Sequence, residues 1–458
     1  MKCKIGLLSL SLILFGCNDQ QQTNQTIVVP EKPKNIIMVV GDGMGPAYIS
    51  AYRYFNDDPN TAEIEKTVFD RTLVGMSSTY PAPVSGYVTD SAAGATALSA
   101  GVKTYNGAIA MDVNKQPVTT VLEVSKRLGK KTGVVVTSQV NHATPASFMS
   151  HNEARGNYDE IADSYVDNYQ MYDVVLGGGW KFFLRDDRDL VSEFKELGYQ
   201  YVDDYAALNN VAKDKPLLGL FADVGLPWAL DDTDANRLKT MTSTALDQLE
   251  SDKGFFMLIE ASQVDWGGHS NDIAAAMGEM QDLASTLEML EEYVAQHPDT
   301  LVVVTADHST GGMTLGANGK YEWKPEVLRS MTHSPIYIAE QLLKADITEA
   351  LTSDLFSFKL TESELSLLSF SKSMGENNPQ LSNEGNPYAD ASADAVKQAL
   401  YVNIKHIIDA RTLTGWTTGA HTAVDVPVFA FGSHSESFVG LSNNTDIANT
   451  VFSLLEQK

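Results

Sequence analysis

Short apolar runs alternate with amphipathic segments along most of the chain. Runs rich in Val, Ile and Phe occur at residues 36–40, 133–137, 255–259, 301–305 and 426–431, with the five- or six-residue length typical of buried strands. Helical patterns lie between several of these runs, for example at residues 121–128 and 273–294. Strands that alternate with helices predict an α/β fold: a three-layer α/β/α sandwich around a mainly parallel central sheet.

Residues 313–417 interrupt this alternation and predict an insertion into the main body. Apolar helical segments at residues 336–343 and 393–408 flank a polar stretch at residues 375–386. The segment is far longer than an ordinary loop. It also has the apolar side chains needed to form a small core, among them Trp323, Leu342 and Phe356. We therefore expect an accessory lobe and not an extended loop.

The N-terminus has the pattern of an export signal. Lys2 and Lys4 precede an apolar run at residues 6–15, and residues 14–17 resemble a bacterial lipobox that ends in Cys17. This predicts a lipoprotein-type signal peptide at residues 1–17, acylation of Cys17, a flexible tether at residues 18–33 and an enzyme domain at residues 34–458. The expected location is the periplasm or cell envelope, with a lipid anchor in the outer membrane. Phe15 replaces the small residue usual in a lipobox, so an ordinary cleaved signal is the alternative.

Charge and cysteine content narrow the functional classes. The net charge of −26 argues against nucleic-acid binding, because there is no basic excess to neutralise phosphates. An anionic small-molecule substrate would need concentrated positive charge at its site, which bound divalent cations can supply. The two cysteines, Cys3 and Cys17, both precede the enzyme domain, so neither a disulfide framework nor a cysteine-based zinc site is expected there.

Potential metal ligands follow four of the predicted strands. Ligands of open α/β sheets bind beyond the carboxyl ends of the strands, so these side chains should meet at one edge. One such residue alone would be explained as a helix cap or a structural histidine. Their coincidence, with imidazole suited to zinc and oxygen ligands suited to magnesium, predicts a multi-metal site. The residues are Asp42; His142 and Thr144; Glu260, Asp265 and His269; and Asp307 and His308.

A serine stands at the start of a predicted helix of small residues. Ser91 begins the sequence Ser-Ala-Ala-Gly-Ala-Thr-Ala, and a helix N-terminus offers free N–H groups to a phosphate. Ser91 could instead serve only as the helix cap. No histidine lies near it in sequence to act as a base, so a metal ion is the expected activator of a nucleophilic hydroxyl.

These segments resemble the alkaline phosphatase family. Residues 88–97 match the nucleophile motif of that family, and residues 101–107 continue the match. Residues 41–45, 176–179 and 305–308 also resemble family motifs. The similarity extends from about residue 34 to residue 440, except in the insertion at 313–417. The resemblance implies a phosphate monoesterase that works through a phosphoserine at Ser91.

The resemblance also implies roles for individual residues. Two zinc ions and one magnesium ion are expected, with Arg155 binding two phosphate oxygens through its planar guanidinium. The sequence departs from the best-known bacterial pattern at His142, which replaces Asp, and at Trp266, which replaces Lys; both are expected to face the substrate. We expect His142 to hold a water of the magnesium ion. The implied zinc ligands are Asp265, His269 and His421 for one ion and Asp42, Asp307 and His308 for the other; Asp42, Thr144 and Glu260 would hold magnesium.

Other functions are compatible with the same architecture. Sulfatases, phosphodiesterases and phosphate mutases are alternatives, because fold does not fix function. Ser91 is not followed by the Pro and Arg of a sulfatase nucleophile motif. A non-enzymatic, metal-stabilised surface lipoprotein is a further alternative, although such a site needs no serine.

Family members are usually homodimers with a crown-like insertion, so a dimer built partly by residues 313–417 is expected.

Overall fold

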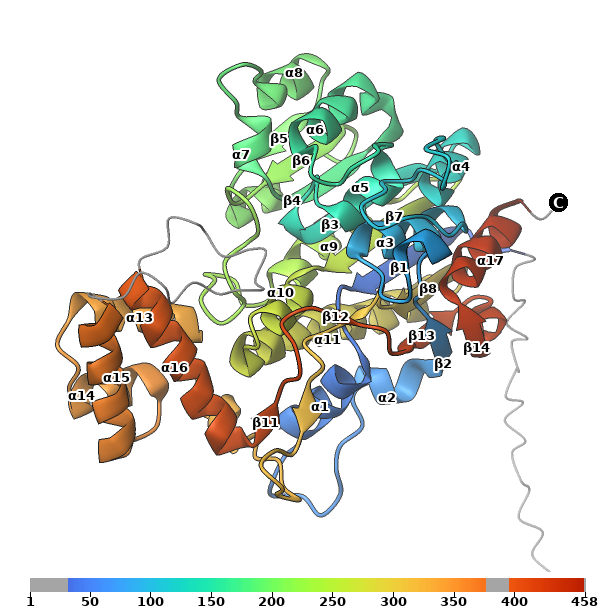
Figure 1. Cartoon of the computed structure of the whole chain (residues 1–458). Helices are drawn as coiled ribbons and strands as arrows, with labels where there is room; N and C mark the ends of the chain where they lie inside the picture. The colour runs from blue at the N-terminus through green and yellow to red at the C-terminus, as the bar shows by residue number, and fades with distance from the viewer. Residues whose placement is uncertain (1–31, 376–394, 457–458) are drawn as a thin grey trace, which may run out of the picture.

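A ten-stranded sheet forms the centre of the protein in a computed structural model that describes residues 32–375 and 395–456 (Figure 1). The strand order is β14-β2-β13-β8-β1-β7-β3-β4-β6-β5. Strand β13 runs antiparallel to both of its neighbours, and the other pairs in this sheet are parallel. The strands are β1 (Asn35–Gly41), β2 (Leu73–Ser78), β3 (Lys131–Gln139), β4 (Val174–Gly178), β5 (Gln200–Val202), β6 (Leu217–Leu220), β7 (Phe255–Ala261), β8 (Thr300–Thr305), β13 (Val426–Gly432) and β14 (Gly440–Asn443).

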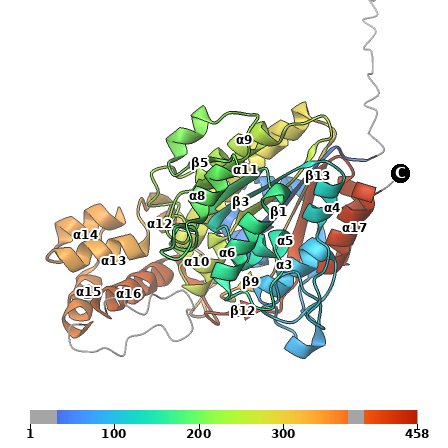
Figure 2. The same cartoon turned by 90° about the horizontal axis from the view of Figure 1, so that it is seen from above.

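Helices cover both faces of this sheet, which confirms the predicted α/β sandwich (Figure 2). Alternation along β1 shows why: Ile37 and Val39 belong to one core, and Met38 and Val40 belong to the other. The first core contains α1 (Pro46–Asn56), α2 (Val68–Thr72), α9 (Arg237–Leu249) and α11 (Ile273–Gln296). The second contains α3 (Ser91–Ala100), α4 (Val121–Arg127), α5 (Ala143–Met149), α6 (Tyr158–Asp167), α8 (Leu190–Glu196) and α17 (Asn444–Glu456).

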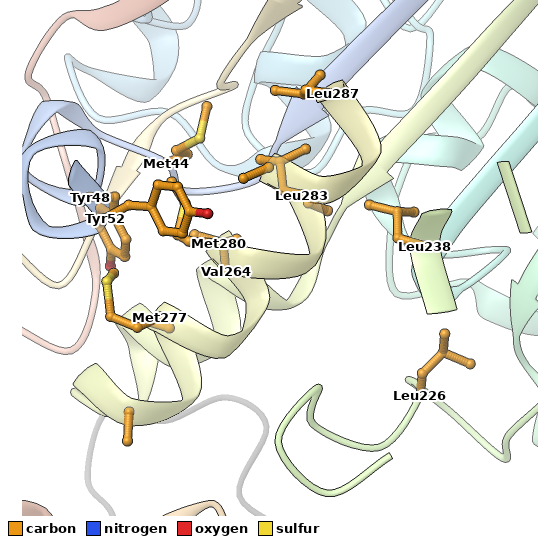
Figure 3. Close-up of a cluster of buried hydrophobic side chains, with 14 of the residues drawn as sticks. Met44, Tyr48, Tyr52, Leu226, Leu238, Val264, Met277, Met280, Leu283 and Leu287 are labelled. Atoms are coloured by element: carbon orange, nitrogen blue, oxygen red, sulfur yellow. The ribbon is translucent and has the colours of Figure 1, made fainter. Parts of the chain in front are cut away.

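Helix α11 contributes many of the buried side chains of the first core (Figure 3). Its residues Met277, Met280 and Leu283 pack with Met44 and Tyr48, which follow β1. Each such buried side chain contributes roughly 1.5–3 kcal/mol by leaving water. The chain segment after β1 is therefore held firmly against α11, next to the short helix α10 (Gln263–His269).

Helices of residues 313–417, here called the accessory lobe, lie beside the sheet and contribute side chains to the first core (Figure 1). The described elements are β10 (Thr314–Leu315), α12 (Glu326–Ser330), α13 (Pro335–Lys344), α14 (Glu349–Phe356), α15 (Glu362–Gly375), α16 (Ala395–Thr412) and β11 (Thr414–Gly415). The chain leaves and returns through two antiparallel pairs. Strand β10 pairs with β11, and β9 (Ser309–Thr310) pairs with β12 (His421–Thr422), so that Thr310 lies opposite His421.

The expected signal peptide, Cys17 and most of the tether lie outside the described residues. Within residues 32–375 and 395–456, no helix combines the length and apolar character that crossing a membrane requires.

Candidate active site

The carboxyl ends of β1, β3, β7 and β8 bring the predicted metal ligands together. Strand β1 lies between β7 and β8, and β3 lies on the other side of β7. Because these four strands are parallel, the residues at their carboxyl ends share one edge of the sheet. Asp42, Thr144, Glu260, Asp265, Asp307 and His308 are all fully buried there. Buried charges of this density are stable only if they are paired or bind metal ions.

His308 occupies the centre of the first ligand group. Its Nε2 atom lies 3.1 Å from Oγ of Ser91, 3.2 Å from Oδ1 of Asp42 and 3.2 Å from Oδ2 of Asp307. One ring nitrogen carries at most one proton, so it cannot satisfy three oxygens as a hydrogen-bond donor. A divalent cation among these atoms would satisfy them all. Asp42, Asp307 and His308 are therefore suited to hold a metal ion beside the serine hydroxyl.

His269 and His421 define a second group with Asp265. Their Nε2 atoms are only 3.0 Å apart. The Nδ1 atom of His269 donates to the carbonyl oxygen of Gly419 (2.7 Å), and that of His421 donates to the carbonyl oxygen of Thr89 (2.9 Å). Carbonyls only accept, so Nδ1 of each ring carries a proton; when both rings are neutral, as metal ligands must be, their Nε2 lone pairs point toward each other and toward Asp265, whose carboxylate oxygens lie 3.3 and 3.7 Å away. A cation removes this repulsion, and imidazole favours zinc.

A third group comprises Asp42, His142 and Glu260, whose ligand atoms lie within 4.8 Å of one another. Thr144 follows His142 in the first turn of α5. Both oxygens of Asp42, Oε1 of Glu260 and Oγ1 of Thr144 are buried and receive no hydrogen bond from the part of the chain that the structure describes. Leaving such atoms unsatisfied costs about 1–3 kcal/mol each. Their oxygen chemistry fits a magnesium ion.

The acidity of these carboxyl groups also reflects the crowding of negative charge. Burial, followed by repulsion from Asp307, raises the pKa of Asp42 well above its usual value. Burial raises the pKa of Glu260 to about 8. A divalent cation at this position would lower both values, because it stabilises the ionised form. The electrostatics of the site therefore favour occupancy by metal ions.

Helix α3 delivers Ser91 to the metal ligands. Asp90 is the N-cap residue, and its carboxylate accepts a hydrogen bond from the backbone N–H of Ala93 (3.0 Å). Asp90 therefore caps the helix, and the Ser91 hydroxyl is directed at His308. Gly94 allows this approach, since a Cβ at that position would lie 3.0 Å from both Cβ and the carbonyl oxygen of Asp307.

Arg155 lies between Asp90 and His142. Its guanidinium donates to Oδ2 of Asp90 (3.1 Å) and to Nε2 of His142 (3.2 Å). Burial and the charge of Arg155 lower the pKa of His142 to about 3, so its ring is neutral and accepts this hydrogen bond. The ring of Trp266 meets His142 edge to face, with centroids 6.0 Å apart. The two departures from the family pattern are therefore in contact with each other.

Thr310 is a site residue that the sequence patterns did not indicate. Its hydroxyl donates to Oδ1 of Asp265 (2.5 Å) and lies 3.2 Å from Nδ1 of His308. It thus contacts ligands of the first and second groups. Ser262 similarly donates to Oε2 of Glu260 (2.6 Å). Both residues stand two positions after a predicted ligand, the only sequence signal that could have marked them.

Comparisons with known proteins agree with this architecture. A family profile described as alkaline phosphatase matches residues 33–457. Alkaline phosphatase 3 of Bacillus subtilis (strain 168) is 45% identical over 98% of this chain and 94% of its own length, and alkaline phosphatase 4 of the same organism is 43% identical over 97% and 94%. The cold-active alkaline phosphatase of a psychrophilic Shewanella species superimposes with a TM-score of 0.85, at 50% identity, covering 92% of this chain and all of that chain.

Fold, site and relatives together define a phosphoric monoester hydrolase that has groups of metal-binding residues. The chain belongs to the alkaline phosphatase family. The resemblance and the enzyme class expected from the sequence are both confirmed.

Proposed function

We propose that this enzyme hydrolyses phosphate monoesters in two displacements through a phosphoserine at Ser91. The serine oxygen attacks phosphorus and the ester oxygen departs with the alcohol; water then attacks the phosphoserine, releases inorganic phosphate and restores the hydroxyl. Two successive inversions give overall retention at phosphorus. The observation that carries this proposal is the 3.1 Å approach of the buried Ser91 hydroxyl to His308, within a group of metal ligands.

Three metal positions follow from the chemistry of the ligand groups. Zinc is assigned to Asp265, His269 and His421, and a second zinc to Asp42, Asp307 and His308, because imidazole nitrogen suits zinc. Magnesium is assigned to Asp42, Thr144 and Glu260, with His142 orienting one of its waters. When bound, these ions lower the pKa of hydroxyl groups and stabilise negative charge on the phosphoryl group. Structures of TAB5 alkaline phosphatase variants in which one histidine is replaced by Glu or Asp, 27% identical to this chain, hold magnesium in a site called M3.

The protein's own groups position the substrate. Asp90 fixes one end of the Arg155 guanidinium through a 3.1 Å hydrogen bond. The fork of Arg155 can then bind two phosphoryl oxygens, which carry more negative charge in a monoester than in a diester. His142 and Trp266, in contact beside Arg155, are proposed to line the same side of the phosphate. The N–H groups at the start of α3 add positive potential near Ser91.

A chelation and trapping experiment tests this function. Purified enzyme should hydrolyse p-nitrophenyl phosphate, lose the activity with EDTA and recover it with zinc and magnesium. Acid quenching during turnover should yield a peptide phosphorylated at Ser91. Near-normal turnover by Ser91→Ala would reject the covalent mechanism. A metal-stabilised lipoprotein without enzymatic function would show no turnover in either condition.

We also propose export, acylation of Cys17 and a homodimer in which the accessory lobe takes part. The support for the anchor is the basic and apolar pattern before Cys17. Mass spectrometry of the native N-terminus tests it, since an unmodified residue other than Cys17 would exclude the anchor. For the dimer, light scattering on a folded variant with the lobe replaced by a Gly-Ser linker should show a monomer.

A further inference from the structure

The accessory lobe contacts a short turn that directly follows two of the candidate metal ligands. Residues 270–272 connect the end of α10, which carries Asp265 and His269, to the start of α11. Asn271 in this turn has a positive φ of 50°. Asn tolerates this left-handed conformation better than most non-glycine residues, and contacts from its surroundings hold it there. The turn is therefore a place where neighbouring contacts determine the backbone.

Two side chains of α16 hold this turn from the lobe side. The ammonium group of Lys405 donates to the carbonyl oxygen of Ser270, the residue that ends α10. One helical turn earlier, the hydroxyl of Tyr401 donates to Oδ2 of Asp272 (3.0 Å). Asp272 is itself buried and caps α11 by accepting from the N–H of Ala275 (3.0 Å). Lys405 and Tyr401 thus hold the C-cap residue of α10 and the N-cap residue of α11.

The other side of the turn faces the chain that leads to His421. With its amide nitrogen turned toward its acceptors, Asn271 donates to the carbonyl oxygens of Thr418 (2.9 Å) and Gly268 (3.0 Å). His269 donates to the carbonyl oxygen of Gly419 (2.7 Å) in the same segment. The turn therefore lies between the lobe helix α16 and the segment that places His421.

We propose that Lys405 and Tyr401 of the accessory lobe are positioning residues for the metal ligands Asp265, His269 and His421, and that they act through the 270–272 turn. The inference rests on the proposed zinc site. The lobe sets the separation of the two imidazole nitrogens, which are 3.0 Å apart, by holding both the end of α10 and the cap of α11. Groups hydrogen-bonded directly to metal ligands usually change metal affinity by about 10–100-fold. Lys405 acts one residue further away, on the residue that follows His269, so an effect at the lower end of this range is expected.

The test measures zinc retention instead of activity. Zinc-loaded Lys405→Met and Tyr401→Phe are mixed with excess 4-(2-pyridylazo)resorcinol, well below the unfolding temperature, and zinc release is followed by absorbance. Both variants should release the more labile zinc at least about tenfold faster than the unsubstituted enzyme. Lys405→Arg, which keeps a cationic donor, should return the rate toward that of the unsubstituted enzyme. Tyr401→Phe keeps the test decisive if Lys405→Met does not fold.

Lys397→Met is the matched control. Lys397 lies on the same helix, but its ammonium group pairs with Glu340 (3.4 Å) within the lobe. It should release zinc at the unsubstituted rate. Equal release rates in Lys405→Met, Tyr401→Phe and the unsubstituted enzyme would overturn the inference while leaving the proposed function intact. An unsubstituted enzyme that binds no zinc would instead overturn the proposed metal site, and this inference with it.

Discussion

The hydroxyl of Thr310 donates to Oδ1 of Asp265 across 2.5 Å and so contacts a ligand of the second metal group from the strand that follows His308. The hydroxyl oxygen of Thr310 also lies 3.2 Å from Nδ1 of His308. Thr310→Val keeps the shape of the side chain but removes both polar contacts. We expect zinc affinity to fall about 10–100-fold, because the carboxylate and the imidazole lose the partner that orients them.

Equilibrium zinc titration with a competing chelator measures this change. Thr314→Val is the control, since Thr314 is exposed in β10 and its hydroxyl donates to a nearby carbonyl oxygen, that of Gly316. If Thr310→Val and Thr314→Val bound zinc equally well, Thr310 would have no part in orienting the ligands.

Arg155 should discriminate between monoesters and diesters. If Arg155 binds phosphate as proposed, Arg155→Ala removes two charge-assisted hydrogen bonds to phosphoryl oxygens, worth about 1.5–3 kcal/mol each. We expect kcat/KM for p-nitrophenyl phosphate to fall at least about a hundredfold, and kcat/KM for bis(p-nitrophenyl) phosphate to fall much less. Arg155→Lys restores the charge without the planar fork and should recover only part of the loss. An equal loss on both substrates would show that Arg155 does not select monoesters.

Gly94 should be required for the position of Ser91, the proposed nucleophile, and not for helix stability. Alanine favours a helix by about 1 kcal/mol over glycine. At this position, however, the new Cβ would lie 3.0 Å from Asp307, so α3 or the ligand must move by a few tenths of an ångström. We expect Gly94→Ala to lower kcat by about tenfold with little change in thermal stability, because small displacements of reacting groups slow catalysis steeply.

Gly278→Ala is the control for this prediction. It is the same substitution inside a helix, and the atoms nearest to its Cβ would be side-chain atoms of Leu230 and Ala229, with no backbone among them. Its kcat should be unchanged. If the two variants had the same kcat, the close contact between α3 and Asp307 would be without catalytic consequence.

The sequence predicts which side chains meet wherever a candidate ligand directly follows a strongly apolar strand. Asp42 and Asp307 follow β1 and β8, whose buried runs are unmistakable, and the parallel pairing of these strands makes their meeting a consequence of topology. His421 could be placed only through the family resemblance, because β12 is two residues long and depends on pairing with β9. Thr310 was missed because a hydroxyl that acts by contact with a ligand has no pattern of its own.

The same reasoning explains which strands were missed. Strands β5 and β6 have three and four residues, and β4 includes Gly177 and Gly178, so their apolar signals are short or interrupted. Strand β2 lies near the sheet edge with Leu73 exposed, and β14 forms that edge with Leu441 exposed. Edge strands lose the continuous apolar pattern that identifies central ones. Their place in the sheet is set by tertiary contacts that a local pattern does not contain.

A buried arginine should contribute strongly to the stability of the contact between α9 and α11. Arg237 on α9 is fully buried and pairs with Glu279 (2.7 Å) and Asp282 (2.9 Å) on α11. Arg237→Met fills a similar volume but leaves the buried carboxylates of Glu279 and Asp282 without their cationic partner. In the part of the chain that the structure describes, the backbone N–H groups of Ala229 and Leu238 still donate to them. Removing one member of a buried ion pair costs about 3–5 kcal/mol, so we expect the free energy of unfolding to fall by this amount at pH 8.

The loss of unfolding free energy in Arg237→Met should be larger at high pH than at low pH. Burial already raises the pKa of Asp282 to about 7 beside Arg237, and removing the arginine takes away the attraction that lowers it. When the pKa of a carboxyl group is higher in the folded state than in the unfolded state, the protein becomes less stable as the pH rises from the unfolded-state pKa toward the folded-state pKa. The deficit of Arg237→Met relative to the unsubstituted enzyme should therefore be smaller at pH 5.5 than at pH 8. Urea unfolding of the metal-free proteins at both pH values measures it.

Arg71→Met provides the comparison for this effect. Arg71 pairs with Glu291, also on α11, but both side chains are partly exposed, at 41% and 30%. Water replaces the lost partner of an exposed carboxylate, so the cost should stay below about 1 kcal/mol and change little with pH. A deficit in Arg237→Met that matched that of Arg71→Met at both pH values would mean that Glu279 and Asp282 find other partners once the arginine is gone. The buried cluster would then not be what holds α9 against α11.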